Sequence, residues 1–281
     1  GTDWIDVLSQ DVFAQDYHLS IFRKVGGTSF SATLGYNNTP GVVINSGMQR
    51  FTGILNINSS LKKKLHLNLK VSYTHTDRDR ASAAITGTST SAAVYLSPLL
   101  DPEATWNRYG DQESSGGAAF NSPYLVAKNT VNESWQNYIM ASSTLKYDIT
   151  RRMNLKVRLA LTDRRTETGY YSPSYLPVAK INKTGGTARS NDNRLTKYIG
   201  EATWNYNRKI KAHEFNALLG FTAEHWIRKY KALSGSGYTN DNLTYKNLLG
   251  LVHPDTFSAS SYEQYQDKLS ALGRFNYNYR R

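Results

Sequence analysis

The chain has 281 residues, a formal net charge of +12 at pH 7 and no cysteine, which excludes a disulfide framework and any cysteine-ligated metal site. No apolar run approaches the 18 or so residues that a membrane-spanning helix needs, which argues against a helical membrane protein. The chain is 12% aromatic, with 20 Tyr residues, and this composition favours strands over helices.

The positive charge is scattered along the chain, which argues against nucleic acid as a partner. Lysine and arginine bind nucleic acid when they gather in a patch that neutralises phosphates. The longest basic run is Lys62-Lys63-Lys64, and it lies between two alternating segments, where we expect a solvated turn. The N-terminus has neither a basic nor an apolar leader segment, so we expect a mature fragment if the protein crosses a membrane.

Alternation of apolar and polar side chains is the dominant pattern. In one segment Leu65, Leu67, Leu69, Val71 and Tyr73 form one face, and polar residues form the other. Such alternation predicts strands with one apolar face. It recurs in about nine segments, which in chain order lie around residues 19–21, 30–36, 51–57, 65–73, 135–147, 153–161, 198–206, 215–223 and 269–279.

Short and long connections alternate between these segments. We expect tight turns at residues 26–27 and around 60–62, 150–152 and 207–209, and longer loops at about 37–48, 77–133, 168–192 and 228–264. Outer-membrane barrels have short periplasmic turns and longer extracellular loops, and they close with an even number of strands. The sequence therefore predicts an all-β fold, an antiparallel transmembrane β-barrel that is partial, with an ascending strand expected before residue 1.

The charged positions predict which face meets lipid. A Lys or Arg on the lipid side at mid-membrane costs about 2–4 kcal/mol, so the charged residues of the polar faces should line the lumen. Aromatic residues near strand ends on the apolar faces are typical of interfacial girdles. The residues that we assign to the lumen-facing wall are His66, Lys70, Lys146, Lys156, Arg158, Glu201, Glu224 and Arg274.

Several motifs resemble the SusC/RagA group of TonB-dependent outer-membrane transporters. They are Thr2-Asp3-Trp4, Gln15–Ser20, Phe30–Tyr36, Gly41–Gly47, Arg50–Gly53 and Leu272–Tyr277. The group is similar in architecture to the 22-stranded plugged transporters. The resemblance implies that residues 1–281 form part of one such barrel domain, with residues 1–15 as an extracellular lead-in, and that a plug and a TonB-contacting segment precede them.

The resemblance also implies a function. It predicts energy-dependent import of oligosaccharides or peptides across the outer membrane of a Gram-negative bacterium. The expected partners are a SusD-like surface lipoprotein that lids the barrel, TonB through the N-terminal segment, the solute and outer-membrane lipid. Two alternatives stay open: a passive porin or adhesin-type barrel, which needs no plug, and a soluble β-rich carbohydrate-binding module.

The residues suggest no catalytic or cofactor chemistry. The histidines show no metal-ligand spacing, and no Ser/His/Asp set is evident, so we predict neither an enzyme nor a cofactor. His75, Asp77 and Asp79 lie together where a loop begins. A cation site there is disfavoured, because Arg78 and Arg80 interleave with them.

Aromatic residues in the long loops are the candidate contacts for substrate or lid. Ring faces can cover the C–H surfaces of sugars while polar neighbours fix the hydroxyls. Packing of the loops against one another is the simpler explanation, and we favour it for any single residue. The candidates are Tyr95, Trp106, Tyr109, Tyr124, Tyr170, Tyr171 and Tyr175.

Overall fold

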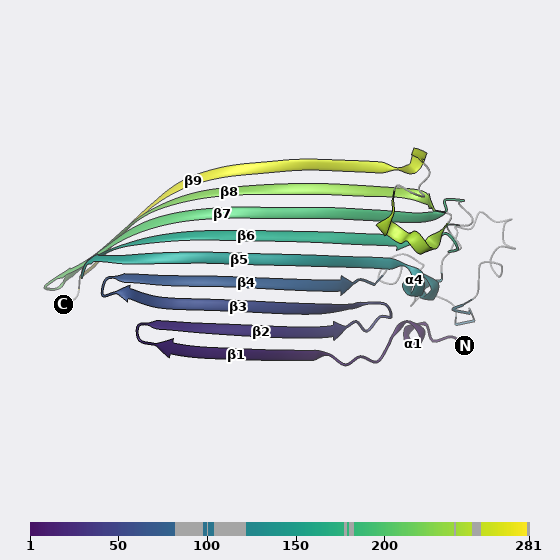
Figure 1. Ribbon diagram of the computed structural model, residues 1–281, viewed down its shortest axis with the longest axis horizontal. Helices are drawn as coiled ribbons and strands as arrows, with labels where there is room; N and C mark the ends of the chain where they lie inside the picture. Colours follow the sequence, from purple (N-terminus) through teal and green to yellow (C-terminus); the bar gives the residue numbers. More distant parts are fainter. Residues whose placement is uncertain are drawn as a thin grey trace.

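The computed structural model describes residues 1–81, 98–99, 101–103, 122–176, 179, 183–238, 240–248 and 254–279. These residues form one antiparallel sheet in which nine strands follow the order of the chain (Figure 1). The strands are β1 (Gln15–Val25), β2 (Thr28–Pro40), β3 (Gly47–Lys62), β4 (Leu65–Asp79), β5 (Val131–Thr150), β6 (Met153–Ser172), β7 (Gly186–Ile210), β8 (His213–Tyr238) and β9 (Ser258–Tyr279). In this described part of the chain the sheet is open, with β1 and β9 as its two edges.

Among the described residues, four short helical segments accompany the sheet. They are α1 (Trp4–Leu8), α4 (Pro123–Asn129), η2 (Asp241–Lys246) and η3 (Pro254–Thr256). All four lie near the end of the sheet that carries the long connections, and η2 lies beside β6 and β7 (Figure 1). No helix in the described part of the chain is both long and apolar enough to cross a membrane.

The alternation of connection lengths is confirmed, although its boundaries differ from those predicted. Two-residue turns at 26–27, 63–64, 151–152 and 211–212 define a short-turn end of the sheet. The opposite, long-loop end has its connections at 173–185 and 239–257, which are shorter than the expected 168–192 and 228–264. The strands extend further than predicted because backbone pairing continues after the hydrophobic alternation has stopped.

The register of β1 is continuous. Its pairs with β2 run without a break from Gln15 opposite Asn38 to Val25 opposite Thr28. The turn that follows contains Gly26 with a φ of +57°, a left-handed conformation that glycine adopts without steric cost. The pairing of β1 with β2 therefore keeps one register up to the turn.

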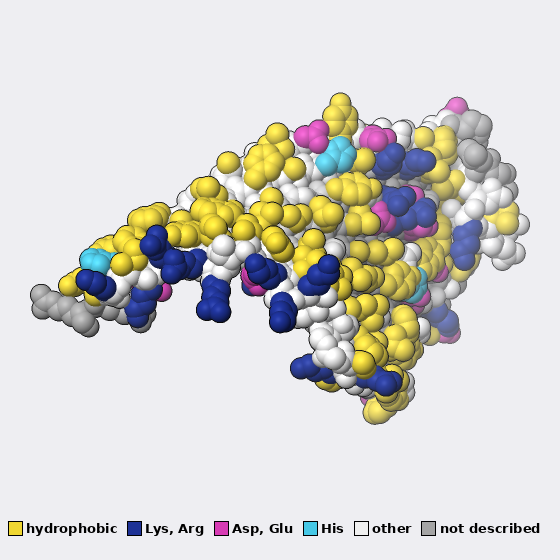
Figure 2. Space-filling view, turned by 60° about the vertical axis from the view of Figure 1, so that its left-hand side comes forward, with side chains coloured by type: hydrophobic (Ala, Val, Ile, Leu, Met, Phe, Trp, Pro, Cys, Tyr) yellow, Lys and Arg dark blue, Asp and Glu magenta, His cyan; other side chains and the backbone are white. Residues whose placement is uncertain are grey.

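The register also sorts the side chains onto two faces, and the apolar face points outward. One cross-strand row runs from Ile57 through Leu69 and Leu159 to Leu269. Leu159 is 61% exposed and Leu269 is 71% exposed. Figure 2 shows hydrophobic side chains gathered in a continuous band over the strands. We call this side the apolar face and the opposite side the charged face.

The height of the band suits a bilayer. In β6 the outward positions are apolar from Met153 to Leu161, which is about 27 Å of strand. A tilt near 40° reduces this to about 20 Å of height, close to the apolar band of about 25 Å in outer-membrane barrels. The exposed apolar face therefore has the dimensions of a lipid-facing surface.

The long-loop end holds a conventional hydrophobic cluster. Its buried members are Tyr171, Ala188, Tyr238, Tyr245 and Leu248. They bring η2 down onto the outer side of the sheet. A Cβ at Gly169 would collide with the ring of Tyr245, so this position requires the absence of a side chain.

A partly buried hydrogen-bond network ties η2 to the end of β6. Asp241 accepts bonds from Tyr171 Oη at 2.6 Å, Ser174 N at 2.7 Å and Ser174 Oγ at 2.7 Å. Burial opposes ionisation of Asp241, but these three bonds outweigh it and hold the pKa of its carboxyl below the usual value. Nearby, Tyr245 Oη donates to Glu133 at 2.7 Å.

The lead-in segment packs at the same end. Asp3 caps α1 by accepting from Ile5 N at 3.0 Å and Asp6 N at 3.2 Å. Trp4 and Leu8 then bury against Ala127 of α4. The stretch from residue 1 to 15 is thus anchored to the long-loop end of the sheet.

The assignment of faces predicts opposite tolerance at two adjacent residues of β4. In the full-length protein, Leu69→Arg should destabilise the folded barrel by about 2–4 kcal/mol, because it places a charge on the lipid side. Lys70→Leu, on the charged face, should be mild. Urea unfolding in liposomes, followed by heat-modifiable gel migration, measures both. Equal tolerance of the two changes would contradict the assignment.

The Asp241 network predicts a pH-dependent anchor. Asp241→Asn should cost about 1–3 kcal/mol of local stability, because it removes a charged acceptor from three donors, and amide hydrogen exchange in residues 240–248 should speed up. Because the folded pKa is depressed, the stabilisation is present above about pH 4, the unfolded value, and is lost as pH falls through the folded value. The exposed Asp11→Asn change serves as the control, and exchange that is unchanged in Asp241→Asn would refute the network's role.

Candidate functional site

The charged face is the first part of the candidate site. The register places all eight residues of the expected lumen-facing wall on it. His66 lies opposite Lys146, which lies opposite Lys156, and Arg158 lies opposite Glu201. The full set is His66, Lys70, Lys146, Lys156, Arg158, Glu201, Glu224 and Arg274.

Some of these charges are paired within the wall. Arg158 Nη1 lies 3.0 Å from Glu201 Oε2, and Lys197 Nζ lies 2.7 Å from Glu224 Oε1. These pairs are partly exposed, so each contributes little stability, but they orient the side chains. Lys70, Lys156 and Arg274 have no ion-pair partner among the residues that the structure describes, and along the strands of this face basic side chains outnumber acidic ones.

Near the short turns, His66 belongs to a group of polar contacts that also includes Asp148, Lys146 and Ser60. Asp148 Oδ2 lies 3.1 Å from His66 Nε2, and Asp148 Oδ1 lies 2.9 Å from Lys146 Nζ. Ser60 Oγ lies 3.1 Å from the other ring nitrogen of His66. Both ring nitrogens are therefore occupied by hydrogen bonds, as expected for a wall residue and not for a metal ligand.

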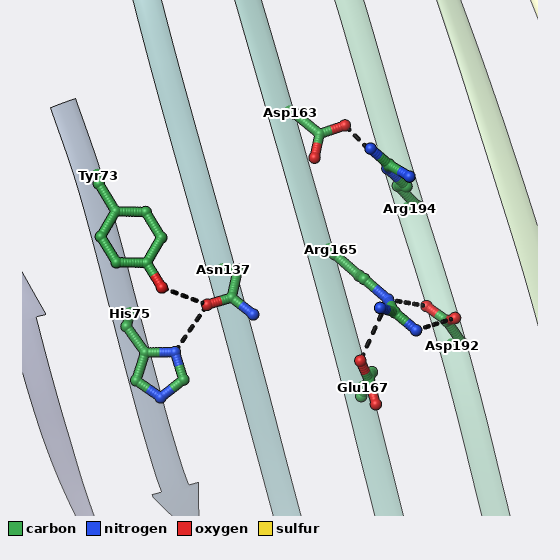
Figure 3. Close-up of polar contacts among 8 residues, drawn as sticks. All are labelled: Tyr73, His75, Asn137, Asp163, Arg165, Glu167, Asp192 and Arg194. Carbon is green, nitrogen blue, oxygen red and sulfur yellow. Dashed lines mark hydrogen bonds and ion pairs between the residues drawn. The ribbon is translucent and has the colours of Figure 1, made fainter. Parts of the chain in front are cut away.

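On the outer side of the sheet, a belt of polar contacts lies between the apolar band and the long loops (Figure 3). Arg194 Nε donates to Asp163 Oδ1 at 3.0 Å, joining β7 to β6. Arg165 makes a two-pronged contact with Asp192, at 3.2 Å and 2.9 Å, and it lies 3.1 Å from Glu167. Charges of this kind do not face hydrocarbon, so the apolar band ends at the level of Asp163.

Strands β4 and β5 carry the same belt on their outer side. Tyr73 Oη donates to Asn137 Oδ1 at 2.8 Å, and His75 Nδ1 lies 2.7 Å from the same oxygen (Figure 3). His75 Nε2 also lies 3.1 Å from Asp77. In the described ranges no cluster of three or more His, Cys, Asp or Glu residues could hold a metal ion, so the cation site weighed from the sequence gains no support.

The candidate aromatic residues that the structure describes do not form one site. Tyr171 is 1% exposed beneath η2 on the outer side, so it packs the loop and offers no surface to a solute. Tyr170 lies on the charged face, between Asn132 and Arg189 in register.

Two more candidates belong to the loop region, and three cannot be placed. Tyr124 lies on α4 with Lys128 Nζ 5.2 Å from its ring centre. Tyr175 is 46% exposed, and its hydroxyl donates to Asn129 Oδ1 at 3.1 Å. Tyr95, Trp106 and Tyr109 lie outside the described residues.

The charged face also contains a cavity of about 360 Å³ between β6, β7 and β8. Its row of Arg164, Leu195 and Arg228 is aligned across the three strands. The sequence did not predict this cavity: of its lining residues only Glu224 is among those assigned above to the lumen-facing wall, and the others lie beyond the alternating segments or in an expected loop. The alternation of Glu224, Trp226 and Arg228 along one face was the available signal. The lining residues are Arg164, Asn193, Leu195, Lys197, Glu224, Trp226 and Arg228.

Comparison with curated proteins finds similarity along the whole chain. The chain is 24% identical to TonB-dependent receptor P3 of Formosa agariphila over 99% of its length, and 23% identical to TonB-dependent receptor P26 of the same bacterium over 100%. It spans 28% of the length of each relative. No family model matches the chain.

Solved structures share the fold. The RagAB peptide transporter superposes with a TM-score of 0.79 at 19% identity, covering 99% of this chain and 31% of that one. The unliganded ferric citrate transporter FecA superposes with a TM-score of 0.60 at 7% identity, covering 95% and 32%. The resemblance drawn from the motifs is confirmed: the chain is similar along its whole length to two TonB-dependent receptors, and its fold matches part of the barrel of the RagAB transporter.

Proposed function

We propose that the chain is part of an outer-membrane importer that takes up oligosaccharides or peptides by TonB-dependent transport. The observation that carries the proposal is the arrangement of the two faces of one long antiparallel sheet. It is the reverse of that in a soluble protein: apolar side chains are exposed on the outside, and charged side chains lie on the opposite side. The charged face then lines the lumen, and the long-loop end is extracellular.

The long-loop end is the part that we propose meets the solute and a SusD-like surface lipoprotein. It carries α1, α4 and η2, which are anchored to the sheet by buried clusters. Tyr124, Tyr170 and Tyr175 remain candidate contacts in this region. TonB would act through a segment N-terminal to this stretch, as the SusC/RagA resemblance implies.

The neighbouring structures support transport of an oligomeric solute. The RagAB structures are of a peptide importer in closed and open states, and the curated relatives are receptors. We therefore propose transport and not catalysis. The soluble carbohydrate-binding alternative conflicts with the exposed apolar band, because a soluble module buries such a face in a core.

Dependence on TonB distinguishes this proposal from a passive porin. In the source bacterium, deleting the gene for the full-length receptor should abolish uptake of its labelled oligosaccharide or peptide. Deleting tonB should have the same effect, because a plugged barrel opens only when energy is supplied. Outer-membrane fractionation with a heat-modifiable gel band is the accompanying control. Uptake that persists without TonB would indicate a passive pore.

A further inference from the structure

The cavity on the charged face holds two arginines without counterions. Arg164 on β6 and Arg228 on β8 flank Leu195 in one cross-strand row. Strands lie about 4.8 Å apart, so the two side chains begin about 10 Å from each other. Arg228 Nε donates to Asn193 Oδ1 at 3.3 Å. In the described part of the chain, neither arginine has a carboxylate within ion-pair distance.

The remaining charges do not neutralise the cavity. Lys197 and Glu224 form their own pair at 2.7 Å, which leaves both guanidinium groups uncompensated. Guanidinium presents a planar fork of donors that matches a carboxylate in a two-pronged contact. The electrostatic character of the cavity therefore favours an anionic group of that shape.

Aromatic surface lies beside the two arginines on the same face. Trp226 lines the cavity, and its indole N–H donates to Gln266 Oε1 at 2.8 Å, which fixes the ring. Four residues beyond Trp226 on β8, Tyr230 stacks on Tyr262 with ring centres 5.1 Å apart and planes at 25°. Flat rings next to polar groups suit sugar rings, whose C–H surfaces they cover.

We infer that this cavity is a subsite for an acidic oligosaccharide, in which the carboxylate of a uronic-acid unit lies between Arg164 and Arg228 and its ring lies against Trp226. The inference rests on the proposed import function. Fixed aromatic surface beside the guanidinium groups favours a sugar acid over an acidic peptide side chain, which needs only the charge.

The position of the cavity suits capture from the extracellular side. Arg164 follows Asp163 directly in β6, and Asp163 belongs to the belt that ends the lipid contact (Figure 3). The cavity therefore lies at the outer limit of the membrane, on the charged face. Lys156 and Lys146 continue the basic character toward the short turns.

Calorimetry on the full-length receptor, purified in detergent, tests the inference. The probes are hexagalacturonate, neutral cellohexaose and a hexaglutamate peptide. Wild type should bind hexagalacturonate most tightly, and less tightly as salt is raised, because salt screens exposed charges. Arg164→Gln together with Arg228→Gln should weaken this binding at least about tenfold, the loss expected for charge-assisted hydrogen bonds.

Lys229→Gln is the matched control, because it removes the same charge from the adjacent residue of β8 on the outer side. It should change the affinity by less than about twofold, since exposed surface pairs contribute little. Trp226→Leu should weaken hexagalacturonate binding several-fold if the ring covers the sugar. A heat-modifiable gel shift in every variant shows that the barrel has folded.

Several results would overturn the inference without touching the import function. They are absence of hexagalacturonate binding in wild type, equal binding by the double variant, and preference for hexaglutamate or cellohexaose. In each case TonB-dependent uptake of another solute would leave the import proposal intact. Loss of TonB dependence in wild-type cells would instead refute import.

Discussion

The structure depends on one constraint: in each strand, successive side chains must point to opposite faces, and all nine strands must keep the same phase. A slip of one residue in any strand would exchange its faces. In β4 it would bring Lys70 toward lipid and Leu69 toward the charged face. The register from β1 to β9 avoids this exchange, since its three irregularities, at Ser60, Asp148 and Gly186, lie at strand ends.

The same constraint explains why the hydrophobic clusters lie at one end. Within the apolar band the outward side chains need no protein partner, because lipid covers them. Beyond the band, outward side chains meet water, so they become ion pairs such as Arg165 with Asp192 or are covered by a loop. Tyr171 is of the second kind: η2 covers it, Tyr245 of η2 belongs to the same buried cluster, and Asp241 is the polar anchor that holds the covering loop.

The sequence predicts the structure only where this constraint produces a clear alternation of apolar and polar residues. Inside the band, alternation is almost complete, so the strands and both faces could be derived from residues such as Leu65 to Tyr73. Above the band, hydrophobicity no longer alternates, because Asp163 and Arg165 face water as Arg164 does. The sequence therefore predicts loops where β6 extends to Ser172 and β8 to Tyr238, and it does not separate the role of Tyr171 from that of Tyr170.

That loss of alternation also locates the cavity. Asp163, Arg164 and Arg165 are consecutive, so β6 carries charge on both sides at this height. Lower in the strand, one side must be apolar to meet lipid, and charge is restricted to the other. Beyond the apolar band, a barrel wall can carry charged side chains on both faces of a strand. An arginine on the inner face can then have ion pairs on the outer face at the same height. The ion pairs from Asp163 to Arg194 and from Arg165 to Asp192 join β6 to β7, and thereby support from behind the two strands that present Arg164 and Leu195.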